Sequence, residues 1–269
     1  MAENNYTNSR RNEAMEAFGK LLEIMDELRE KCPWDSSQTF ESIRPLTIEE
    51  TYELSDAVLD GNLPSVQKEL GDILLHVVFY AKIAKEKQAF DMVDVVNGLI
   101  KKLIYRHPHI YGNVKVSGST EVVENWEQLK LTEKDGNKTV LSGVPSSLPA
   151  LIKANRIQEK VRAVGFDWEE RSQVWDKVSE ELEELKAEIK FANAENIEQE
   201  FGDLLFSVVN AARLYNVDPE TALERTNRKF MKRFGYLESK TVKQGHSLKE
   251  MTLDQMNEIW DEAKQFDKE

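Results

Sequence analysis

The sequence has few of the residues that mark disulfide-linked, membrane-spanning or secreted proteins. Of its 269 residues only Cys32 is a cysteine, so no disulfide can form within the chain, which fits a reducing cytoplasm. No apolar run approaches the roughly 18 residues that cross a bilayer, and the first residues show no basic-then-apolar signal pattern. We therefore expect a cytoplasmic protein without a membrane segment.

Positive charge is also scarce relative to negative charge. The chain has 36 basic and 49 acidic side chains and a formal net charge of -13. A nucleic-acid or anionic-membrane surface needs concentrated lysine and arginine, so neither partner is expected. Glycine and proline number only 12 and 7, and no segment is of low complexity, which favours a helical protein over a disordered or β-rich one.

Apolar residues recur with the spacing of amphipathic helices along most of the chain. From Val66 they fall at offsets of 0, 4, 7, 8, 11, 12 and 15 residues, which places them on one face of a helix over residues 65–88 and excludes a strand. The same reasoning predicts helices at about residues 13–31, 47–59, 91–105 and 121–131. The polar stretch 134–147 contains glycine and proline and has the composition of a linker.

Acidic residues of the first half reappear in the second half at a constant shift of 131 positions. The matched pairs are Glu49 and Glu180, Glu50 and Glu181, Glu53 and Glu184, Glu69 and Glu200, and Asp72 and Asp203. The apolar face that starts at Val66 is copied with them, from Ile197 onward. Such a repeat indicates homologous domains. We predict an all-α protein with two tandem helical-bundle domains, residues 1–133 and 148–269, joined by the linker 134–147.

The repeated carboxylates have the spacing of a metal site. Glu181 and Glu184 are three residues apart, as are Glu200 and Asp203, so each pair shares one sector of its helix. Two antiparallel helices would bring the pairs together, and four carboxylates that close repel each other unless a cation lies between them. Oxygen donors alone suit Mg²⁺ or Mn²⁺, whereas Zn²⁺ would recruit histidine or cysteine.

Two alternatives stay open at this point. A di-iron carboxylate bundle usually has a histidine three residues after a glutamate, and that position holds Asp72 or Asp203 here. A non-enzymatic module that senses nucleotide or metal would use the same acidic bundles without turnover. Metal analysis separates the first alternative, and product formation separates the second.

Basic residues supply a partner for a phosphate chain. Lys229 and Arg233 are one helical turn apart, and the pair recurs as Lys102 and Arg106 at a shift of 127. No glycine-rich phosphate loop is present, so phosphate binding has to rest on metal and side chains.

Two tryptophans of the second half have different expected roles. Trp260 matches Trp126 at a shift of 134, and it is a candidate to stack on a base, the alternative being a core aromatic. Trp168 is expected to be a packing residue near the domain entrance.

These motifs together resemble the MazG family of nucleoside triphosphate pyrophosphohydrolases, within the all-α pyrophosphatase superfamily that includes dimeric dUTPases. The resemblance rests on the repeated Glu-Glu-x-x-Glu and Glu-x-x-Asp patterns and on stretches typical of the two-domain bacterial members. These stretches are Cys32-Pro33-Trp34-Asp35, Gln38-Thr39-Phe40, Arg106-His107-Pro108-His109, Gly165-Phe166-Asp167-Trp168 and Asn227-Arg228-Lys229-Phe230. They extend over nearly the whole chain.

The resemblance implies Mg²⁺-dependent hydrolysis of a nucleoside triphosphate to the monophosphate and diphosphate, with broad base tolerance and a house-cleaning role. Mn²⁺ would be a substitute metal. Water would attack the α-phosphorus, and the carboxylates assigned to it are those of Glu180 and Glu181, between which the sequence does not choose. The implied metal ligands are Glu181, Glu184, Glu200 and Asp203. The implied substrate contacts are Lys177, Lys229, Arg233 and Trp260.

In two-domain members of the family the catalytic role is generally assigned to the C-terminal half. The first half would then be mainly structural, and the role of its metal set is in doubt. That set consists of Glu50, Glu53, Glu69 and Asp72. Nothing in the sequence explains the asymmetry, because every ligand is retained. Helical hairpins with broad apolar faces bury them best by pairing, so we also expect a homodimer.

Overall fold

The computed structural model describes residues 2–132, 139–168, 170–191, 193–243, 245 and 247–268. All regular elements in these ranges are helices, which confirms the predicted fold class. The chain divides into two compact units, which are Met1–Val114 and Lys115–Glu269. The division precedes the predicted linker 134–147, part of which, residues 134–138, lies outside the described residues. No described helix has the length and hydropathy that a membrane span requires.

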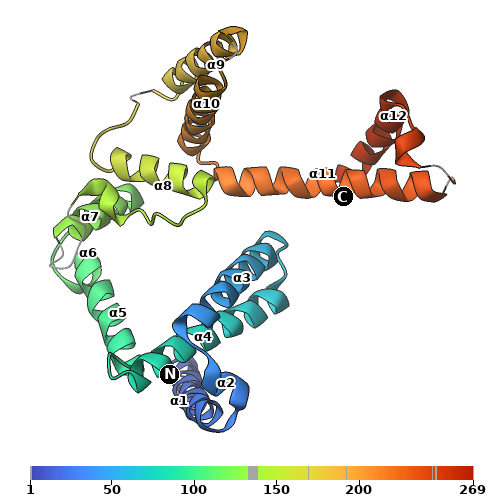
Figure 1. Cartoon of the computed structure of the whole chain (residues 1–269). Helices are drawn as coiled ribbons and strands as arrows, with labels where there is room; N and C mark the ends of the chain where they lie inside the picture. Colours follow the sequence, from blue (N-terminus) through green and yellow to red (C-terminus); the bar gives the residue numbers. More distant parts are fainter. Residues whose placement is uncertain are drawn as a thin grey trace. The chain divides into compact units, whose positions relative to one another are not determined.

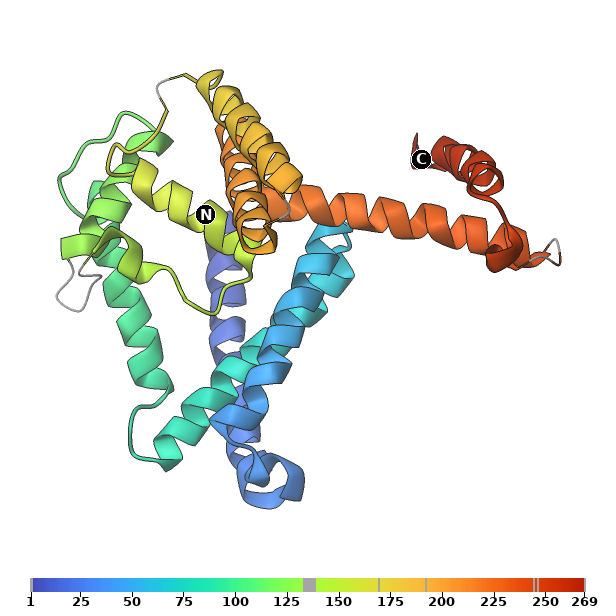
Figure 2. The ribbon, with the colours of Figure 1, turned by 45° about the horizontal axis from the view of Figure 1, so that its top comes forward.

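The first unit is built around a helical hairpin that packs on a long helix. Its elements are α1 (Ala2–Lys31), α2 (Pro33–Ser37), α3 (Phe40–Leu59), α4 (Leu63–Glu86), α5 (Met92–Arg106) and α6 (Pro108–Tyr111). The antiparallel helices α3 and α4 lie side by side in both views (Figures 1 and 2). The buried core joins Met25 of α1, Ile43 of α3, and Val78, Phe79 and Ile83 of α4. This core positions the first acidic set, which lies on α3 and α4.

Helix α3 begins at Phe40, earlier than the predicted residue 47. A capping box starts it: the Ser42 backbone N–H donates to Thr39 Oγ1 over 3.3 Å, and the Thr39 N–H donates to Ser42 Oγ over 2.9 Å. Pro45 then lies inside the helix, where proline removes one backbone hydrogen bond. The cap and the burial of Ile43 outweigh that local cost.

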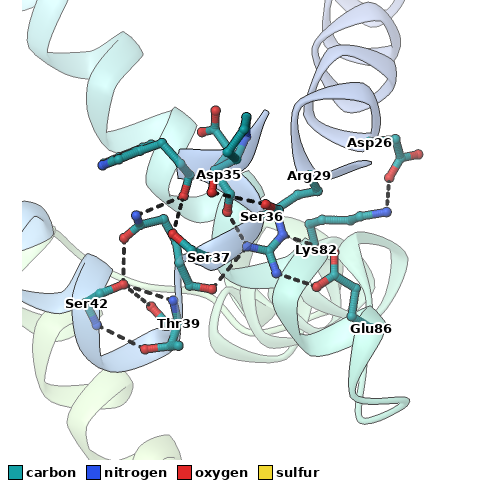
Figure 3. A network of polar contacts seen from close by, with 12 residues as sticks. Asp26, Arg29, Asp35, Ser36, Ser37, Thr39, Ser42, Lys82 and Glu86 are labelled. Atoms are coloured by element: carbon teal, nitrogen blue, oxygen red, sulfur yellow. Dashed lines mark hydrogen bonds and ion pairs between the residues drawn. The ribbon is translucent and has the colours of Figure 1, made fainter. Parts of the chain in front are cut away.

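Arg29 ties α1 to α4 and to the loop before α3 (Figure 3). Its Nε donates to Glu86 Oε1 over 3.1 Å, and its Nη1 donates to the carbonyl oxygens of Gln38, over 3.0 Å, and of Asp35. The hydrogen bond from Arg29 lowers the pKa of Glu86. Because the Arg29 side chain is only 8% exposed, these contacts replace the water it would otherwise bind.

The second unit contains another antiparallel hairpin and a long helix that leads away from it. Its elements are α7 (Ser119–Thr132), η1 (Val140–Gly143), α8 (Ala150–Arg162), α9 (Gln173–Phe191), α10 (Ala194–Leu214), α11 (Pro219–Lys243), η2 (Leu248–Glu250), α12 (Leu253–Ala263) and η3 (Lys264–Lys268). Helices α9 and α10 lie side by side (Figures 1 and 2), and α8 packs on α10. Helix α12 folds back on α11, where Lys240 and Tyr236 both contact Glu262.

Candidate metal centre

The turn between α9 and α10 sets the register of the second acidic hairpin. The Asn193 side-chain oxygen accepts hydrogen bonds from the backbone N–H groups of Glu195 and Asn196, at 3.2 and 3.4 Å, and so caps α10. The Asn196 amide then donates to Glu188 Oε2 of α9 over 2.9 Å. This contact between the helices holds them in the alignment that brings their carboxylates together.

Three of the predicted metal ligands converge on this hairpin. Glu181, Glu184 and Glu200 each place a carboxylate oxygen within 4.8 Å of the other two. Burial raises the pKa of Glu200, and the neighbouring charges of Glu184 and Asp203 raise it further. The Oε2 atom of Glu200 is buried and has no hydrogen-bond partner in the described part of the chain. A buried, unpaired carboxylate oxygen among other carboxylates fits a divalent cation with oxygen ligands.

Lys177 lies at the edge of this cluster. Its Nζ is 2.8 Å from Glu181 Oε1 and 2.9 Å from Glu180 Oε1, both on its own helix. Hydrogen bonds to Glu181 and Glu180 raise the pKa of Lys177, so the ammonium stays charged. Lys177 was predicted as a substrate contact, and its side chain lines the cavity that adjoins the cluster.

A cavity of about 590 Å³ adjoins the acidic cluster. Its wall includes Gln158, Trp168, Lys177, Glu181, Asp203 and Asn210. The volume falls within the range of about 300–1,000 Å³ that is usual for ligand pockets. Asp203 therefore lines the cavity and is also close enough to Glu200 for its charge to raise the pKa of Glu200. Trp168, expected to be a packing residue, is 41% exposed and forms part of the wall.

Gln158 of α8 is a cavity residue that the sequence did not single out. It is 4% exposed, and its Nε2 donates to the Phe206 carbonyl oxygen over 2.8 Å. Its Oε1 is buried and has no hydrogen-bond partner among the described residues. A lone glutamine on an amphipathic helix gives no pattern that would mark it, because its role depends on contact with another helix.

An ion pair between Asp167 and Arg213 holds the segment that leads into α9. Arg213 Nη1 donates to Asp167 Oδ2 over 3.0 Å, and the two side chains are only 8% and 17% exposed. Gly165, two residues earlier, has a φ of 86°, a conformation that residues with a Cβ rarely adopt. The pair joins residues 46 positions apart, and no periodic pattern in the sequence predicts it.

The remaining predicted substrate contacts lie on α11 and α12. Arg233 places its guanidinium carbon 5.5 Å from the centre of the Trp260 ring, and Phe230 packs against the same ring at 4.9 Å between centroids. Lys229 lies on α11 one helical turn before Arg233, and its side chain is exposed. The structure thus brings Arg233 and Trp260 together, but within the described ranges neither these two nor Lys229 lines the cavity.

The first acidic set gathers on α3 and α4 in a similar way. Glu50, Glu69 and Asp72 place carboxylate oxygens within 4.8 Å of one another. Burial raises the pKa of Glu50, and Asp72 and Glu53 raise it further. Glu53 is the fourth predicted ligand, and its Oε2 lies 3.9 Å from the Nζ of Lys68. Lys68 was not among the predicted site residues.

Comparison with known proteins matches both hairpins to one family. A family model described as the MazG nucleotide pyrophosphohydrolase domain matches residues 38–111 and again residues 170–236. The first match contains α3 and α4, and the second contains α9 and α10. The tandem repeat predicted from the constant shift is thereby confirmed.

Relatives are similar over nearly the whole chain. A Thermotoga maritima protein named nucleoside triphosphate pyrophosphohydrolase/pyrophosphatase MazG is 45% identical over 250 residues, which are 92% of this chain and 95% of that protein. The nucleoside triphosphate pyrophosphohydrolase of Escherichia coli (strain K12) is 40% identical over 257 residues, or 93% of this chain and 98% of that protein. The uncharacterized protein YabN of Bacillus subtilis is 42% identical over 93% of this chain, which corresponds to 52% of YabN.

Proposed function

Because this chain belongs to the MazG family, we propose that it hydrolyses nucleoside triphosphates to nucleoside monophosphates and diphosphate at its C-terminal acidic site. One observation supports this choice above all: Glu181 belongs both to the carboxylate cluster and to the wall of the cavity. A triphosphate held at the cluster would therefore leave its nucleoside next to a cavity of suitable size.

The residues that would hold the metal are Glu181, Glu184, Glu200 and Asp203. All four offer only carboxylate oxygens, and the buried Oε2 of Glu200 lacks another partner in the described part of the chain, so the donor set fits Mg²⁺, with Mn²⁺ as a substitute. When bound, the ion supplies positive charge that offsets the charge of the triphosphate and polarises its phosphoryl oxygens. Every other contribution comes from side chains of the protein.

The reaction requires a water molecule to be deprotonated next to the α-phosphorus. Its oxygen forms a bond to that phosphorus while the bond to the α,β-bridging oxygen breaks, and diphosphate leaves. Glu180 and Glu181 are the carboxylates proposed to orient the water and accept its proton. Lys177 bonds to both and keeps its positive charge, so it is placed to hold these carboxylates and to attract a phosphate oxygen.

The cavity is proposed to accept the nucleoside. Trp168 offers a ring for stacking, and Gln158 and Asn210 offer amide groups. The wall also contains the rings of Phe166 and Phe206, and stacking on aromatic rings does not distinguish one base from another, which supports broad base tolerance and a house-cleaning role in the cytoplasm. The support for Lys229, Arg233 and Trp260 as further substrate contacts comes from the resemblance and from the recurrence of the basic pair.

A homodimer is part of the same proposal. Helix α10 exposes Phe201, Leu205 and Val208, at 48%, 59% and 44%, on one side of the helix. Apolar side chains at this spacing form a stripe that a second copy of the chain could cover.

The proposal is tested by incubating the protein with each nucleoside triphosphate and Mg²⁺ and separating the products. Monophosphate and diphosphate in equal amounts are the expected result. Nucleoside diphosphate with phosphate would contradict the reaction, and tight Mg²⁺-dependent binding without any product would favour a sensing module instead.

A further inference from the structure

Lys68 lies among the carboxylates of the N-terminal hairpin. Its Nζ is 2.9 Å from Glu69 Oε1, 3.0 Å from Glu69 Oε2, 3.5 Å from Asp72 Oδ2 and 3.9 Å from Glu53 Oε2. Glu53 belongs to α3, whereas Glu69 and Asp72 belong to α4. The ammonium therefore bridges the two helices and contacts three of the four carboxylates that were predicted to bind metal.

The C-terminal hairpin has no lysine at the matching position. Adding 131 to residue 68 gives Gln199, an exposed and uncharged side chain. The lysine of that hairpin, Lys177, contacts Glu181 and Glu180 on its own helix and matches Leu46 in the first half. Lys68 thus contacts three proposed ligands of its cluster from the solvent side, and it leaves the buried Oε2 of Glu50 without a hydrogen-bond partner among the described residues. Lys177 contacts one proposed ligand of its cluster, Glu181.

We propose that Lys68 takes the place of a divalent cation in the N-terminal cluster, so that this copy binds metal poorly although it retains every carboxylate. The inference rests on the proposed function, because it concerns the metal that the C-terminal copy would use. A lysine ammonium attracts carboxylates as a metal ion does. It carries only a single charge, however, and it donates hydrogen bonds instead of accepting lone pairs from ligands. A metal entering the cluster would first have to displace it.

The cost of that displacement has two parts. Entry of the ion breaks the contacts of Lys68 with Glu69 and Asp72, and the displaced ammonium remains tethered near a like charge. At a separation of several ångströms in a partly exposed site, such repulsion weakens binding by about ten-fold or more. Gln199 imposes neither cost on the C-terminal cluster, where the ammonium of Lys177 contacts a single proposed ligand, Glu181.

Reciprocal substitutions test the proposal by direct measurement of Mn²⁺ binding, by calorimetry and by electron paramagnetic resonance. In a background that removes the C-terminal site, E200Q with D203N, we expect almost no binding, and adding K68Q should restore it. In the otherwise unchanged chain, Q199K should weaken Mn²⁺ binding by about ten-fold. K85Q is the matched control, since it removes the same charge from α4 at an exposed position outside the cluster. Circular dichroism checks that each variant is folded.

The outcomes separate this inference from the proposed function. Strong Mn²⁺ binding by the E200Q/D203N background, or no gain from K68Q, would overturn the role of Lys68 even if the wild-type chain releases diphosphate. If K68Q gains binding and K85Q does not, the role of Lys68 is supported even when no diphosphate is formed. In that case the proposed function alone fails.

Discussion

Gln158 and Phe206 join α8 to α10 by a hydrogen bond of 2.8 Å, from the amide nitrogen of the glutamine to the backbone carbonyl oxygen of the phenylalanine. This bond fixes the amide, and it leaves the buried oxygen Oε1 without a hydrogen-bond partner among the described residues. A buried oxygen without a hydrogen-bond partner lowers the stability of the folded chain, and a ligand that donates an N–H or O–H group to it would remove this penalty.

Replacing Gln158 with leucine should therefore weaken substrate binding. We expect KM for the preferred nucleotide to rise by about ten-fold, the equivalent of one lost hydrogen bond, with kcat changed less. Steady-state kinetics with the four common nucleoside triphosphates measures the change for each base. Q67L, an exposed glutamine of the first unit, is the control, and equal effects of the two substitutions would contradict a role in the cavity.

The two acidic hairpins should respond differently to loss of a ligand. D203A should reduce kcat/KM by about 100-fold or more, because it removes a carboxylate from the proposed metal set. D72A, at the matching position of the first hairpin, should leave most of the turnover. Diphosphate release measures both variants. Equal loss in the two would show that catalysis does not reside in one half.

The pKa of Glu200 predicts opposite effects of pH on metal binding and on stability. Because that pKa is raised above its ordinary value of 4.5, the metal-free folded chain takes up a proton at a higher pH than the unfolded chain does. As the pH falls through the raised pKa toward 4.5, the free energy of unfolding should gain a favourable contribution from Glu200. Mn²⁺ affinity should fall in the same window, since only the carboxylate form coordinates the ion.

The comparison for this pH effect is E200Q, which cannot titrate at position 200. Chemical denaturation and Mn²⁺ titration at several pH values should show a smaller pH dependence in E200Q than in the wild type. An unchanged pH dependence in both measurements would rule out Glu200 as its source.

Arg29 is expected to make the largest polar contribution to the first unit. R29M should lower the free energy of unfolding by about 3 kcal/mol, because it leaves Glu86 and the carbonyl oxygens of Gln38 and Asp35 without their donor. K20M breaks an exposed ion pair with Glu23, and it should cost less than about 1 kcal/mol. Urea denaturation of both variants provides the measurement.

The ion pair between Arg29 and Glu86 should change the free energy of unfolding with pH in the direction opposite to that of Glu200. The pKa of Glu86 is lowered by Arg29, so its contribution to stability is present above the ordinary value of 4.5 and is lost as the pH falls through the lower folded pKa. E86Q should remove this loss. A decline in stability below pH 4.5 of the same size in E86Q would assign it to other carboxylates.

The apolar stripe on α10 predicts the effect of a charge on association. L205E should shift the chain from dimer to monomer in sedimentation experiments, because burying a carboxylate in an apolar contact is strongly unfavourable. V242E introduces the same charge at a side chain that is 73% exposed on α11, and it should leave the association state unchanged. A monomeric wild-type chain would contradict the proposed homodimer.

Local and repeated features of the fold were predictable from the sequence, and contacts between distant residues were not. Spacings of three residues and a constant shift of 131 were sufficient to predict that Glu181, Glu184 and Glu200 would meet on a hairpin. The buried pair Asp167 and Arg213 joins residues 46 positions apart, and such a contact leaves no periodic trace.

Lys68 also escaped prediction, whereas Lys177 was predicted only through the family resemblance. The repeat aligned carboxylates with carboxylates, but the two lysines of the clusters occupy unmatched positions, 68 and 177. A repeat search rewards residues that agree, so it passes over those that differ between the copies. Under the proposal for Lys68, those differing residues would distinguish the chemistry of the two hairpins.

The counter-ion of the first hairpin is covalently part of the chain, because it is the ammonium of Lys68. Chelators and dialysis cannot remove it, so the proposal for Lys68 predicts that α3 and α4 keep their thermal stability when divalent ions are withdrawn, whereas α9 and α10 would lose only the part of theirs that ion binding adds. Magnesium shortage would then switch off turnover without unfolding the protein, and activity would return as soon as the ion did.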